Sequence, residues 1–187
     1  MRFWAAITTL LLLRLVSVEA RENKLPADAA AALESGSQFV LYSLLPELVP
    51  GIGFDDDPFA PPEEKKKKEA SQPVLETLHE YKILGHTRLV DAADRKTAVA
   101  SILDSMRTWN GAVAGCFHPR HALRVTHQNV VFDFVICFEC QTIRLYRGAE
   151  SHGYVNITGK PDKLDELLKK AGILLPAPAS VRPLLVK

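Results

Sequence analysis

The sequence has little net charge, few cysteines and no recognisable catalytic motif. Of its 187 residues, 23 are lysine or arginine and 22 are aspartate or glutamate. Residues 1–20 hold two of the basic and one of the acidic side chains, so the rest of the chain carries 21 of each. A net charge near zero gives no general attraction to nucleic acid or to an anionic membrane, and we expect no nucleic-acid partner.

The first twenty residues are expected to be a signal peptide. Met1-Arg2 is a short basic start, a mostly apolar stretch follows, and Val18-Glu19-Ala20 has the small or aliphatic residues of a cleavage site. Arg14 interrupts the apolar stretch, which is shorter than the roughly 20 residues of a membrane-spanning helix. We therefore predict cleavage near Ala20, no stable transmembrane helix afterwards, and a secreted or periplasmic protein. Anchoring by an uncleaved signal is the alternative.

Residues 21–175 are predicted to form one domain. The proline- and charge-rich stretch 46–72 has no apolar period and is predicted to be a surface loop, and residues 176–187, with three prolines, a tail. Apolar spacing and capping residues predict helices over 25–34, 92–109 and 161–171. Strands are predicted over 39–45, 78–90 and 153–158, and as a central hairpin within 115–146.

Consecutive strands with short connections favour antiparallel pairing. The predicted fold class is therefore α+β, with an antiparallel sheet of about four to five strands and two or three helices packed on one face.

The three cysteines all lie in the predicted hairpin, and three is an odd number for an oxidising compartment. On a regular strand, Cys137 and Cys140 would point to opposite faces. That separation weakens the interpretation of C-F-E-C as a redox or zinc motif. A hairpin folded at His127-Gln128 would instead bring Cys116 within a residue of Cys140. We predict a Cys116–Cys140 disulfide, with Cys137 as the spare thiol.

Two other sites remain open. The first is a thiol- or metal-dependent site, in which Glu139 would orient a base; its ligands would be Cys116, Cys137, Cys140 and His121. The second is an anion-binding site, because arginine forks hold carboxylate or phosphate well; it would use Arg120, His121 and Arg124. The sequence indicates no particular cofactor, ligand or partner for either site.

Three segments resemble an uncharacterised family of small exported bacterial proteins. They are FVLYSLLP at 39–46, CFHPRH at 116–121 and DFVICFEC at 133–140. That family pairs a C-F-x-P-R-H segment with a later C-F-E-C, and the resemblance covers about Phe39 to Gly172. It implies export and one coherent domain, and it carries no activity. Since no catalytic signature is complete, we expect a non-enzymatic binding or envelope-associated domain.

Overall fold

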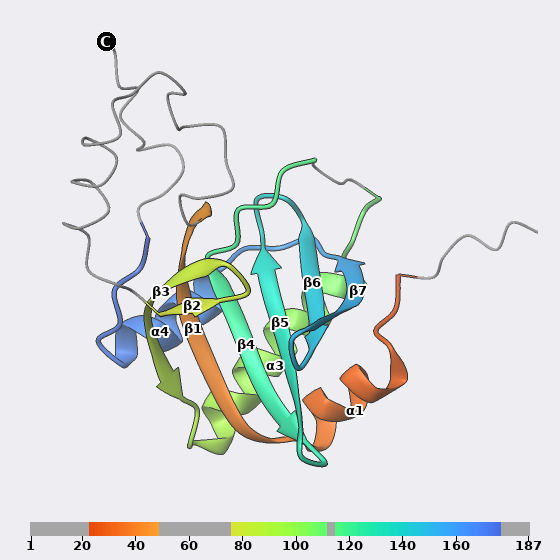
Figure 1. The fold of residues 1–187 in the computed structure, drawn as a ribbon, viewed down its shortest axis with the longest axis horizontal. Helices are drawn as coiled ribbons and strands as arrows, with labels where there is room; N and C mark the ends of the chain where they lie inside the picture. The colour runs from red at the N-terminus through yellow and green to blue at the C-terminus, as the bar shows by residue number, and fades with distance from the viewer. Residues whose placement is uncertain (1–22, 49–75, 112–114, 177–187) are drawn as a thin grey trace, which may run out of the picture.

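The structure is a computed structural model that describes residues 23–48, 76–111 and 115–176. In these residues a seven-stranded antiparallel sheet curls into a half-barrel and is accompanied by three helices (Figure 1). The predicted α+β class and antiparallel sheet are confirmed. The sheet is larger than the four to five strands that we predicted.

The strands lie in the order β2-β3-β1-β4-β5-β6-β7. Their bounds are β1 Ser37–Leu48, β2 Thr77–Leu78, β3 Tyr81–Arg88, β4 His121–His127, β5 Val130–Cys137, β6 Thr142–Arg147 and β7 Glu150–Asn156. Two strands were missed. The strand β2 has only two residues, which is too short to show a period, and all but the last residue of β6 lies within the segment 115–146 that we predicted to be a single hairpin.

The three helices are α1 Ala27–Ser35, α3 Ala92–Arg107 and α4 Asp162–Lys170. Asp91 caps α3, because its carboxylate accepts hydrogen bonds from the backbone N–H groups of Ala93 and Asp94 at 2.6 and 3.3 Å. All three helices contribute to the larger hydrophobic core on one face of the sheet. Their buried members are Ala29, Ala32, Leu33, Ala98, Ile102, Leu164, Leu167 and Leu168.

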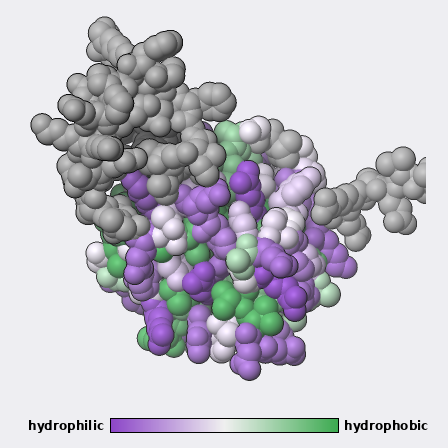
Figure 2. Space-filling view, viewed as in Figure 1, coloured by the Kyte–Doolittle hydropathy of each residue, from purple (hydrophilic) through white to green (hydrophobic). Residues whose placement is uncertain are grey.

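The other face of the sheet is covered in part by the β2–β3 hairpin, which lies in front of the sheet in Figure 1. Leu78 and Tyr81 of this hairpin pack with Ala122 and Val135 in a second, smaller cluster. Polar side chains predominate on the surface seen from this side, with only small apolar patches (Figure 2). Strand β5 contributes Phe134 to the larger core and Val135 to the smaller cluster, so it is buried on both faces.

The β4–β5 hairpin is the predicted central hairpin, with its turn one residue later than expected. Gln128 and Asn129 form the turn, both with positive φ (48° and 62°), and His127 pairs with Val130. Two consecutive left-handed residues match the type I′ turn that suits the twist of paired strands. The ladder reaches back only to His121, so Cys116 lies before the strand and not on it.

Several predictions concern residues outside the described ones. The signal peptide, most of the 46–72 loop and nearly all of the 176–187 tail lie there, although Pro46 to Leu48 belongs to β1. Among the described residues, no helix has the length and apolar character that crossing a membrane requires.

Candidate thiol site

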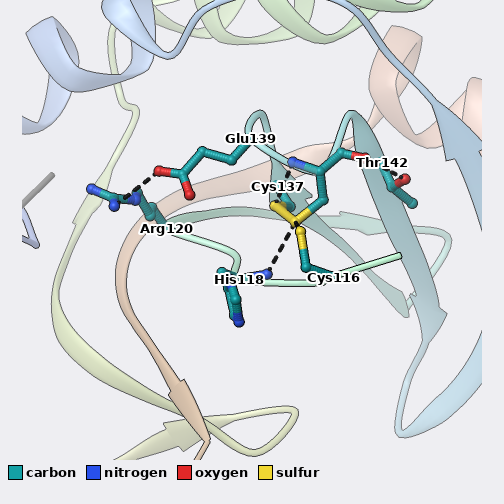
Figure 3. The surroundings of a disulfide bond; sticks show 7 residues. Cys116, His118, Arg120, Cys137, Glu139 and Thr142 are labelled. Atoms are coloured by element: carbon teal, nitrogen blue, oxygen red, sulfur yellow. Dashed lines mark hydrogen bonds and ion pairs between the residues drawn. A yellow bond between two sulfur atoms is a disulfide. The ribbon is translucent and has the colours of Figure 1, made fainter. Parts of the chain in front are cut away.

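The three cysteines meet at one end of β5, and Figure 3 shows the surroundings of their sulfurs. Cys137 is the last residue of that strand, Cys140 lies in the following turn, and Cys116 lies in the segment before β4. Cys137 and Cys140 are at disulfide distance, with their Cα atoms 5.2 Å apart. The sulfur of Cys116 lies 3.0 Å from the sulfur of Cys140. One thiol therefore contacts a sulfur that is already paired.

A tight turn over Phe138 to Gln141 brings Cys140 back beside Cys137. Thr142 pairs with Cys137 across the turn, and Gln141 is in the left-handed region (φ 55°). The backbone N–H of Gln141 donates to the carbonyl of Phe138 at 3.4 Å. The prediction that Cys137 and Cys140 face apart assumed one continuous strand, and this turn overturns it. The segment FECQ contains no glycine, proline, asparagine or aspartate, so its turn carries no common sequence signal.

The disulfide pairing also differs from the prediction. Cys140 pairs with Cys137, and the free cysteine is Cys116 instead of Cys137. Cys116 still comes close to Cys140, as the hairpin geometry suggested. It does so from the irregular segment before β4, because the strand register alone would place it outside the ladder.

The three sulfurs differ in exposure. The residues Cys137 and Cys140 are 1% and 0% exposed, whereas Cys116 is exposed. Two backbone N–H groups point at the buried pair: that of His118 donates to the Cys140 sulfur at 3.3 Å, and that of Cys140 donates to the Cys137 sulfur at 3.0 Å. Such donors favour negative charge on sulfur, because hydrogen bonds to an ionised acceptor are stronger than those to a neutral one. The site has an accessible thiol in front of a shielded pair.

The histidine beside the sulfurs is His118, which the sequence analysis did not select. Ligand atoms of Cys116, His118 and Cys140 all lie within 4.8 Å of one another. His121, the predicted ligand, is 2% exposed and its Nε2 lies 2.8 Å from the carboxylate of Asp165 on α4. The Cys-x-His spacing of CFH was the available signal for His118.

Glu139, the predicted orienting residue, forms a salt bridge with Arg120 at 2.9 Å. The pair flanks the sulfur cluster in Figure 3. The Glu139 side chain is 42% exposed and that of Arg120 is 15% exposed. Glu139 therefore pairs with Arg120, and the carboxylate in contact with His121 is that of Asp165.

The three residues of the predicted anion site are not brought together. Arg120 and His121 line a pocket of about 540 Å³ between α4 and the end of the sheet, together with Lys169. Arg124 lies on the opposite face of β4, where it forms a salt bridge with Asp133. Glu139 forms a salt bridge with Arg120, and Asp165 contacts Nε2 of His121, so both of these residues already have an acidic neighbour.

The chain matches no model of a known protein family, no curated protein and no solved structure. The resemblance of CFHPRH and DFVICFEC to an exported bacterial family stays a prediction. The candidate site is therefore judged on its own geometry.

Proposed function

We propose that this protein is an exported thiol–disulfide exchange domain. The observation that supports the proposal is the line of three sulfurs, in which the free Cys116 lies 3.0 Å from Cys140 while Cys140 is paired with Cys137. Exchange proceeds by attack of a sulfur nucleophile on one sulfur of a disulfide. Bringing a thiol up to a disulfide normally costs translational and rotational entropy. A thiol that is already held in contact with the disulfide avoids most of that cost.

The internal step conserves electrons. The Cys116 thiol first loses its proton to solvent, and its thiolate attacks the Cys140 sulfur; the Cys116–Cys140 bond forms, and the Cys137–Cys140 bond breaks with its electron pair leaving on Cys137. Cys137 then takes a proton from solvent. Either isomer contains one disulfide and one thiol, and Cys140 is bonded in both.

The internal exchange moves the disulfide from two buried cysteines to a pair that includes the exposed Cys116. The disulfide of the structure is shielded, because Cys137 and Cys140 are both buried. Transfer of the bond to Cys116 places one of its sulfurs at the surface, where a partner dithiol attacks Cys116 and forms a mixed disulfide. The second thiol of the partner then releases it: the partner leaves as a disulfide, and the protein gains two electrons and ends with three thiols.

The decisive experiment measures how fast dithiothreitol reduces the disulfide. We expect the oxidised Cys116→Ser variant to be reduced about tenfold or more slowly than the wild type, because the reagent must then reach a buried sulfur. Ser151→Ala, an exposed change that leaves all three sulfurs in place, is the control and should match the wild type. Equal rates for Cys116→Ser and wild type would refute the proposal.

A second variant tests the exchanged isomer directly. Oxidised Cys137→Ser should contain a Cys116–Cys140 disulfide by peptide mass mapping, since that pair needs only the existing 3.0 Å contact. If this bond never forms, Cys137–Cys140 is only a structural link, and the protein fits the non-enzymatic binding or envelope-associated domain expected from the sequence. Export is tested separately. The protein should be found in the periplasmic fraction, and its N-terminus should show cleavage near Ala20.

A further inference from the structure

We infer that the reduced form of this site binds one zinc ion through Cys116, His118 and Cys140, with Cys137 as the fourth ligand. The inference deepens the proposed function and rests on it in one respect, namely that the bond between Cys137 and Cys140 must open. It names a ligand that exchange chemistry alone does not require.

The spacing of the first three ligands suits zinc. Their donor atoms all lie within 4.8 Å of one another, and they come from one short segment and one turn. Tetrahedral zinc with bonds of about 2.3 Å to sulfur and 2.0 Å to nitrogen places neighbouring ligand atoms roughly 3.5–3.8 Å apart. The Cys116 and Cys140 sulfurs, at 3.0 Å, would therefore have to separate by less than about 1 Å.

The turn supplies the fourth ligand. Cys137 and Cys140 have the C-x-x-C spacing of zinc sites, and the turn brings both sulfurs to the same side of the chain. On a regular strand the two sulfurs would point to opposite faces, and this arrangement could not form. After reduction, both sulfurs stay on the same turn and are free to bind the ion.

The surroundings favour a thiolate site. The backbone N–H groups of His118 and Cys140 already donate to the sulfurs of Cys140 and Cys137. Hydrogen bonds of this kind orient the ligands of a metal and stabilise their charge. His118 is exposed, so its ring can turn towards the sulfurs without disturbing the core.

Soft thiolate ligands select zinc over magnesium or calcium, which prefer oxygen. Oxidation to the Cys137–Cys140 disulfide removes two of the four ligands. The site is therefore filled only in the reduced protein, and zinc is released when the disulfide forms. Bound zinc would in turn protect the thiols from oxidation.

The test measures zinc on the full mature chain. Protein reduced with a phosphine and dialysed against zinc sulfate should retain about one zinc per chain by elemental analysis, and the oxidised protein should retain none. His118→Ala should weaken zinc binding by about tenfold or more. His127→Ala, at the far end of β4, is the matched control and should bind as the wild type does.

Replacement of zinc by cobalt adds a readout that does not depend on affinity. Reduced wild type should show the visible and near-ultraviolet bands of tetrahedral cobalt bound to thiolate, and the Cys137→Ser variant a weaker charge-transfer band. If the reduced wild type binds no zinc, or if His118→Ala binds it as tightly as His127→Ala, the inference is wrong. If the reduced wild type binds zinc but Cys116→Ser is reduced as fast as the wild type, only the exchange proposal is rejected. If Cys116→Ser is reduced more slowly but the reduced wild type binds no zinc, only the zinc site is rejected.

Discussion

Arg124 and Asp133 form two parallel hydrogen bonds across strands β4 and β5, at 2.7 and 2.8 Å. The Asp133 side chain is fully buried, and its carboxylate also contacts Nε2 of His79 at 2.7 Å. The His79 ring stacks on Tyr146 at 3.6 Å. This group of residues joins the β2–β3 hairpin to the sheet on the face opposite the helices.

Removing the carboxylate should destabilise the fold strongly. We expect Asp133→Asn to lower the free energy of unfolding by about 2 kcal/mol, because Arg124, whose side chain is 34% exposed, would lose the anionic partner that is fully buried beside it. Urea denaturation measures the loss. The control is Asp104→Asn, which breaks an exposed pair with Arg107 on α3 and should cost less than about 1 kcal/mol. Similar losses for the two variants would contradict the assignment.

The Asp133 carboxylate should also make the free energy of unfolding depend on pH in the acidic range. Burial raises the pKa of Asp133, but the hydrogen bonds from Arg124 and His79 lower it by more than burial raises it. The pKa of Asp133 therefore lies below the ordinary 3.8. A group with a lowered folded-state pKa stabilises the fold above its unfolded pKa and loses that contribution as pH falls through the folded value. Stability should therefore drop below about pH 4. Urea midpoints across this range should fall less steeply for Asp133→Asn; parallel curves would rule Asp133 out as the cause.

Reduction of the Cys137–Cys140 pair should leave the domain folded. Only two residues separate the cysteines, so the chain-entropy model assigns the bond about 2 kcal/mol, against roughly 3.5 kcal/mol for a Cys116–Cys140 loop. In a domain of this size that loss corresponds to a fall in melting temperature of about 4–8 °C. Calorimetry with a phosphine reductant and a chelator checks the value. Complete unfolding on reduction would show that the bond holds the fold.

The β4–β5 turn can be improved. Gln128 and Asn129 both have positive φ, and Asn-Gly is the preferred pair for such a turn. The double substitution Gln128→Asn with Asn129→Gly should raise the free energy of unfolding by about 0.5 kcal/mol. The opposite change, Gly148→Ala in the β6–β7 turn (φ 62°), should lower it by roughly 1 kcal/mol. A loss of stability in the first variant would contradict the turn geometry.

The helices and the central hairpin could be predicted from the sequence because their signals are local. Asp91 before an apolar stripe is enough to begin α3, and alternation from Phe132 to Ile136 is enough to make β5 a strand with one face in the core. These patterns depend on neighbours within a few residues. The α+β class follows from their order along the chain.

The sulfur cluster was decided only by the tertiary structure. Alternation assigns faces only while a strand continues, and β5 ends at Cys137 in a turn with no common signal. The separation of His121 from Arg124 onto opposite faces of β4 follows from the strand, yet their partners Asp165 and Asp133 come from α4 and β5. From the sequence, we predicted that all three cysteines lie in one hairpin. Which two pair, and that His118 stands beside them, depends on how one turn and one incoming segment meet in space.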